Sequence, residues 1–175
     1  MKLLFVLSLL IASASAQTSP SPRVTSACGA QETILRVEED ASSPIALTPD
    51  SAKATIVFIQ DDGISGARQH YTIKIGLNGN WVGAYKQNAY FVVSVDPGEQ
   101  HVCANVQSKS DFGSIFALAH FKAEAGHVYY FRTRFLAGLN SQYPPPPVLA
   151  MDTPDSDEAK FLVASYPLAH MVPAR

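Results

Sequence analysis

Along most of this chain, apolar and polar residues alternate with a period of two, which is the pattern of half-buried β-strands. Residues 71–77, with the sequence YTIKIGL, show this alternation plainly. Asn78-Gly79 follows and favours a tight hairpin, because both residues tolerate positive φ angles. Asp96-Pro97-Gly98 is a second turn signal, since Pro97 presets φ and Gly98 takes a left-handed position. The pattern predicts strands at residues 32–37, 54–60, 71–77, 81–85, 89–95, 100–107, 114–122, 127–135 and 148–151.

Turn signals recur roughly every 8–12 residues, a spacing typical of all-β folds. We therefore expect a mostly β protein, an antiparallel β-sandwich of about seven to eight strands. The domain is expected to occupy residues 53–171. Residues 17–52 are expected to be a flexible N-terminal segment, because residues 17–23 are rich in Ser and Pro and residues 38–51 are acidic and loop-like.

A single helix is expected near the C-terminus, over residues 156–165. Asp155-Ser156-Asp157-Glu158 has the spacing of a capping box, in which Asp155 caps the free N–H groups and Glu158 reaches back. Phe161, Leu162 and Ser165 are expected to share the face that packs on the sheet. Pro167 ends the helix.

Residues 1–16 have the pattern of a secretory signal peptide. Lys2 precedes an apolar run, and Ala14-Ser15-Ala16 predicts cleavage between Ala16 and Gln17. The run is shorter than the ~20 residues that span a bilayer. We therefore expect an extracytoplasmic protein, periplasmic or secreted, with no transmembrane segment after signal removal.

The chain has two cysteines, Cys28 and Cys103. In an oxidising compartment an even count favours pairing, so a Cys28–Cys103 disulfide is expected. Such a bond closes a loop of about 75 residues, which is worth roughly 3–4.5 kcal/mol in the chain-entropy model. The alternative is two separate buried thiols.

Charge and motifs exclude several classes of function. The formal net charge is −2 and the charges are interspersed, which argues against nucleic acid as a partner. Nucleophile-elbow and phosphate-loop motifs are absent, so no catalytic residue and no cofactor is expected. The alternative is an envelope hydrolase or metal-dependent enzyme with dispersed Asp, Glu and His side chains. His101, His120 and His127 lie on or beside neighbouring predicted strands and are its candidate metal ligands.

Aromatic side chains crowd the predicted hairpins, and Trp81, Tyr85 and Tyr90 are the candidate binding residues. An exposed aromatic strip on a β-sandwich can bind an envelope protein, a peptide or a glycan. In the alternative, these rings belong to a two-layer core whose second face the helix covers. A third hypothesis is a carrier of a small apolar ligand, which requires a cavity inside the β-structure.

Three segments carry a family resemblance. Tyr90-Phe91-x-x-Ser94-Val95-x-Pro97-Gly98-Glu99-x-His101-x-Cys103-Ala104-Asn105 resembles the bacterial family known as domain of unknown function 2846. The segments 125–132 and 155–168 are similar to its later hairpin and its C-terminal part. The Pro-Gly-Glu turn also resembles envelope modules of the PEGA type. The resemblance implies an extracytoplasmic β-sandwich, often lipid-anchored in relatives, although no acylation signal precedes Cys28 here. We therefore expect an exported, non-enzymatic binding or structural module of the bacterial cell envelope.

Overall fold

The computed structural model describes residues 26–40, 47–62, 71–86, 88–108, 115–137 and 147–173. The predicted signal peptide over residues 1–16 and the predicted junction between Ala16 and Gln17 lie outside these residues. Within the described parts, no helix is both long enough and apolar enough to cross a membrane.

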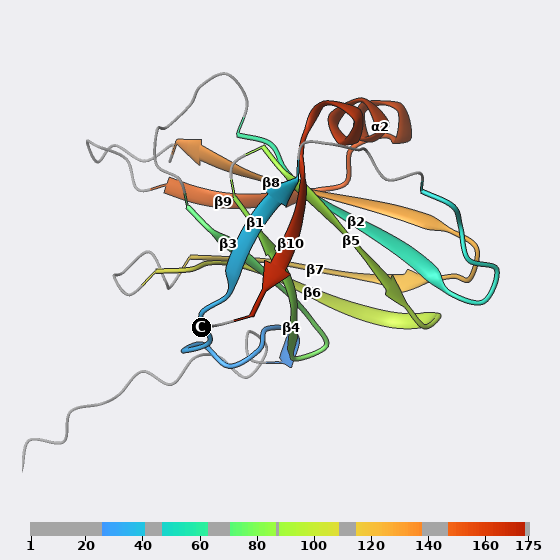
Figure 1. Cartoon of the computed structure of the whole chain (residues 1–175). Coiled ribbons are helices and arrows are strands. Elements are labelled where there is room, and N and C mark those ends of the chain that lie inside the picture. Colours follow the sequence, from blue (N-terminus) through green and yellow to red (C-terminus); the bar gives the residue numbers. More distant parts are fainter. Residues whose placement is uncertain are drawn as a thin grey trace, which may run out of the picture.

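Ten strands in the described residues form two sheets that pack face to face (Figure 1). The six-stranded sheet has the order β1-β10-β5-β2-β8-β9, and the four-stranded sheet has the order β4-β3-β6-β7. The strands of the first sheet are β1 (Arg36–Asp40), β2 (Ala54–Gln60), β5 (Tyr90–Val95), β8 (Val128–Ala137), β9 (Pro147–Asp152) and β10 (Leu168–Val172). Those of the second are β3 (Ile73–Leu77), β4 (Asn80–Tyr85), β6 (Gly98–Val106) and β7 (Phe116–Ala123). The helix α2 (Ser156–Ser165) covers the outer face of the six-stranded sheet, so the predicted mostly β fold with one C-terminal helix is confirmed.

The six-stranded sheet is mixed, whereas an antiparallel arrangement was expected. β2 runs parallel to β8, and β10 runs parallel to β5. β2 lies inside this sheet and is buried along its whole length. Ile56 and Phe58 face the core between the sheets, while Val57 and Ile59 face α2. A strand covered on both faces has no solvated side, which explains its continuous apolar run.

The helix α2 begins where the sequence predicts, but its contacts differ in two ways. The Asp155 carboxylate accepts hydrogen bonds from the backbone N–H groups of Asp157 and Glu158, both at 2.9 Å. Glu158 does not complete the expected capping box, because its carboxylate pairs with Arg132 on β8. The face packed on the sheet is formed by Ala159, Leu162 and Val163. The sequence predicts Phe161 and Ser165 on that face, but Phe161 is 69% exposed and Ser165 is exposed as well.

The first strand lies further along the chain than the sequence predicts. β1 covers Arg36–Asp40, so residues 38–40, expected in a loop, belong to a strand. Part of the segment 17–52 is therefore built into the sheet, where β1 pairs antiparallel with β10. β10 was not predicted. β1 is an edge strand with only Val37 buried, so its charged side chains hide the usual alternation.

Candidate functional site on the outer face of the four-stranded sheet

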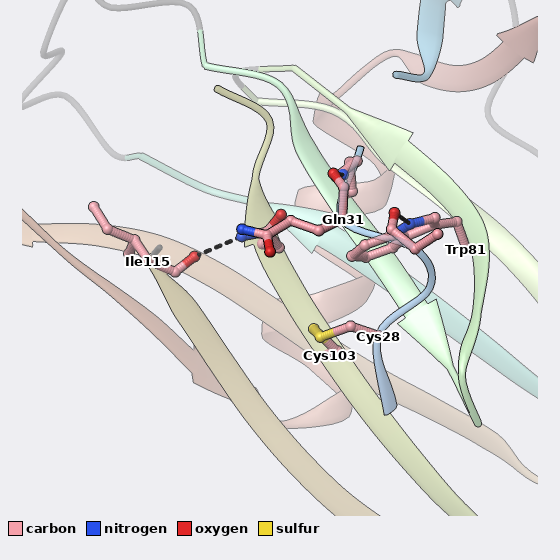
Figure 2. The surroundings of a disulfide bond; sticks show 8 residues. Cys28, Gln31, Trp81, Cys103 and Ile115 are labelled. Atoms are coloured by element: carbon pink, nitrogen blue, oxygen red, sulfur yellow. Dashed lines mark hydrogen bonds between the residues drawn. A yellow bond between two sulfur atoms is a disulfide. The ribbon is translucent and has the colours of Figure 1, made fainter. Parts of the chain in front are cut away.

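The N-terminal part of the described chain lies across the outer face of the four-stranded sheet (Figure 2). We call residues 26–35 the strap. The predicted Cys28–Cys103 disulfide is present and joins the strap to β6, with the two Cα atoms 5.2 Å apart. Cys28 and Cys103 are buried and pack against Trp81 and Phe116. The disulfide therefore fixes the strap over the middle of the sheet.

A buried lysine on β3 holds the strap from below. Lys74 is 1% exposed, and its ammonium group donates to the backbone carbonyls of Gln31 at 3.1 Å and Thr33 at 2.9 Å. The same ammonium lies 4.3 Å from the centroid of the Trp81 ring, within cation–π range. Burial lowers the pKa of Lys74, and the carboxylate of Glu32 acts in the opposite direction. The carbonyls of the strap thus solvate a charge that the sheet would otherwise leave unpaired.

At its C-terminal end the strap is bound by a side-chain amide. Gln107, which follows β6, accepts a hydrogen bond from the Leu35 N–H at 2.7 Å and donates to the Leu35 carbonyl at 3.0 Å. Asn105 stands opposite Lys74 on the neighbouring strand, and its buried side chain donates to the Ile115 carbonyl at 3.1 Å. Polar groups on the covered part of this face therefore have partners, as burial requires.

Two glycines allow the strap to lie close to the sheet. A Cβ atom on Gly76 of β3 would stand 2.7 Å from the Ala27 carbonyl oxygen. A Cβ atom on Gly29 of the strap would stand 2.4 Å from the Trp81 ring. Real Cβ atoms essentially never come this close to another heavy atom, so a side chain at either position would force the strap or the Trp81 ring to shift.

The three candidate binding aromatics do not come together. Trp81 lies under the strap, where its indole N–H donates to the Ala30 carbonyl at 2.7 Å. Tyr85 is fully buried between the sheets, and its hydroxyl shares a 2.8 Å hydrogen bond with Thr133. Tyr90 is fully buried beneath α2. Tyr85 and Tyr90 thus occupy the core positions of the alternative interpretation, in which the helix covers the second face.

A β-bulge explains why Trp81 and Tyr85 face opposite sides. Two residues an even number apart on a regular strand share a face. In β4, however, Trp81 stands opposite Gly76 while Gly83 stands opposite Ile75, so Val82 is the extra residue. The bulge turns Trp81 toward the strap and Tyr85 toward the core.

The part of the face beyond the strap is open. His101 on β6 stands opposite His120 on β7, and both are exposed. Leu118, opposite Cys103, is 48% exposed. His127 lies apart from them at the turn before β8, where its ring is 4.0 Å from Glu124. In the described residues, no three or more His, Cys, Asp or Glu side chains are grouped to hold a metal ion.

A second polar cluster lies between the six-stranded sheet and α2. The Arg132 side chain is 9% exposed and its guanidinium donates to both carboxylate oxygens of Asp152, at 3.1 and 2.8 Å. It also pairs with Glu158 on the helix and with Asp61 after β2. The hydrogen bonds from Arg132 lower the pKa of Asp152. This cluster binds α2 to the sheet through one guanidinium that three carboxylates share. Sequence reasoning missed Arg132 because its partners come from separate segments.

The geometry defines a class of protein: a two-sheet β-sandwich with one outer face under a helix and the other under a disulfide-fastened strap. The chain belongs to the family described as protein of unknown function (DUF2846), whose model matches residues 50–144. The matched residues include Cys103 but end short of Cys28. A search of curated proteins and a search of solved structures each find no match.

Proposed function

We propose that this chain is an exported, non-enzymatic β-sandwich module that binds a partner in the bacterial cell envelope. The observation that carries the proposal is the Cys28–Cys103 disulfide, which fastens the strap across one face of the sheet. Disulfides persist in oxidising compartments and are rare in the cytosol. The signal-like residues 1–16 support the same location.

We place the partner contact on the open part of the strapped face. Leu118 is a large apolar side chain left half exposed, and it stands opposite Cys103, the β6 residue that the disulfide joins to the strap. His101 and His120 extend the surface along β6 and β7. A rigid sheet whose neighbouring strap is already ordered loses little conformational entropy on binding, which favours recognition of a protein or peptide surface.

Export is tested first, by locating the protein in fractionated cells and labelling its thiols. The proposal expects the protein outside the cytoplasm with both cysteines oxidised. A cytoplasmic protein with two free thiols contradicts it.

The contact face is tested by placing a photo-crosslinking amino acid at Leu118 and, as a matched control, at Phe161 on α2, which is more exposed. We expect a discrete crosslinked adduct from position 118. Adding an excess of wild-type protein should suppress this adduct, whereas adding Leu118→Asp protein should not. Equal adducts from both positions, or none from either in the exported protein, refute the assignment. The hydrolase and carrier hypotheses predict instead turnover of an envelope substrate or co-purification of an apolar ligand.

A further inference from the structure

We propose that His101 and His120 form a two-imidazole binding site for a divalent first-row transition metal ion, Cu²⁺ most tightly. The two residues are direct cross-strand partners on β6 and β7. The proposal does not depend on the envelope partner, because it rests on these two side chains alone.

The backbone hydrogen bonds show which kind of cross-strand pair this is. The His101 N–H donates to the Asn78 side-chain oxygen at 2.9 Å, and the His101 carbonyl accepts from the Asn78 N–H at 3.0 Å. Both backbone groups of His101 therefore point to the β3 side and away from β7. Further along β6, the Val106 N–H points to β7 and donates to the Ile115 carbonyl. His101 and His120 are thus a non-hydrogen-bonded pair, the kind whose side chains lie closest, with Cβ atoms ~4.5–5.5 Å apart.

Both imidazoles are available to an ion. His101 shares the outer face with Cys103, while Val102 between them is buried in the core. His120 is exposed, and its neighbour Ala119 packs toward the core. Among the described residues, neither imidazole makes a hydrogen bond or an ion pair, so no partner has to be displaced.

The chemistry of the pair selects the ion. Imidazole nitrogen suits Cu²⁺, Ni²⁺ and Zn²⁺, and Cu²⁺ binds most tightly in that order of metals. The nearest charged side chains along the same face are Glu99 and Lys122, which stand opposite one another and have opposite signs. These two opposite charges offset one another, so neither sign is in excess beside the pair. Two protein donors leave the other coordination positions to water, so the site suits an exchangeable ion.

The test is a Cu²⁺ titration of the purified, disulfide-intact protein, followed by calorimetry and by electron paramagnetic resonance. We expect one ion per chain with hyperfine coupling to two imidazole nitrogens. His101→Asn and His120→Asn should each weaken binding by about 100-fold, because either change removes the gain from joining two donors. The double variant should bind more weakly than either single variant, because each single variant keeps one imidazole donor and the double variant keeps none.

His127→Asn and His170→Asn are the matched controls, because both residues are exposed histidines elsewhere on the molecule. Neither should change the affinity. Thermal unfolding of every variant establishes that the fold persists. Retention of the ion by the double His101/His120 variant, or its loss in either control, overturns the proposal.

Discussion

Removal of the Cys28–Cys103 disulfide is expected to destabilise the protein and to free the strap. The bond joins residues separated by 75 positions, and the chain-entropy model gives about 4 kcal/mol for a loop of that length. For a domain of this size, that change in the free energy of unfolding corresponds to a fall in Tm of about 8–16 °C. Cys28→Ala with Cys103→Ala is the suitable variant, since both side chains are buried and alanine leaves no unpaired polar group.

The strap should detach before the sandwich unfolds. Without the disulfide it is held by hydrogen bonds with Trp81 and Gln107, worth about 1 kcal/mol each, and with the charged Lys74, worth about 1.5–3 kcal/mol each. Packing of the buried Ala27 adds to them. Ordering a backbone residue costs about 1–2 kcal/mol, and the strap contains several residues without such bonds. The entropy of the strap therefore offsets most of its remaining contacts, which makes the strap the least stable part of the variant.

Trp81 makes the two events separable, because it is the single tryptophan of the chain and lies under the strap. Urea unfolding is followed by Trp81 fluorescence for the strap and by circular dichroism for the sheets. In the oxidised protein the two transitions should coincide, and in the double variant the fluorescence transition should come at lower urea. Reduced and alkylated wild type should behave like the variant.

If the urea midpoint of the Trp81 fluorescence transition were the same in the oxidised protein and in the double variant, this reasoning would be refuted. Thiol labelling gives an independent check, since the unreduced, denatured protein should contain no reactive thiol. Two reactive thiols would show that the bond does not form.

Three further substitutions test other contacts. Gly76→Ala drives a Cβ atom into the Ala27 carbonyl, so it should cost about 1–3 kcal/mol in urea unfolding, and less once the disulfide is absent. Arg132→Met removes the cation that Asp61, Asp152 and Glu158 share. The side chains of Asp152 and Glu158 are 37% and 44% exposed and Asp152 keeps Arg134 as a partner, so the change should cost about 1–2 kcal/mol at neutral pH. Arg132 lowers the pKa of Asp152, so the stabilisation from this pair is lost as pH falls below about 4. The free energies of unfolding of the variant and of wild type should then converge. A difference that stays constant with pH contradicts this. Burial raises the pKa of Tyr85, so the unfolded state loses its phenolic proton first and the free energy of unfolding falls as pH rises above about 10. Tyr85→Phe should make this dependence on pH less steep. An unchanged dependence would exclude Tyr85 as its source.

Features set by neighbouring residues could be predicted from the sequence. Asn78 and Gly79 adopt φ angles of 50° and 87°, as the predicted hairpin between β3 and β4 requires. Asp155 caps α2, and the helix spans the predicted residues. β2 also matches its predicted range. In each case the determining interactions lie within a few residues along the chain.

Features set by distant segments could not be predicted. The bulge at Val82 puts Trp81 and Tyr85 on opposite faces of β4, whereas a regular strand would put them on the same face. The bulge depends on the register in which β4 pairs with β3. The short strand β10 follows Pro167 and gains its place by pairing with β1, at the other end of the chain. The charge cluster around Arg132 likewise joins separate segments, so no spacing in the sequence reveals it.

The two outer faces of the sandwich are closed by different physical means, and this difference bears on function. On the six-stranded sheet, apolar side chains of α2 pack on Val57 and Ile59, and an interface of this kind needs no covalent bond. On the four-stranded sheet, the strap covers a buried ammonium group, Lys74, whose lowered pKa reports a desolvation cost. An apolar side chain at that position would avoid the cost, so the lysine is better understood as fixing the path of the strap through the carbonyls of Gln31 and Thr33. Lys74 fixes the path of the strap and the disulfide fixes its position, so the strap is an ordered border on this face. The exposed pair His101 and His120 lies beyond that border on the same face.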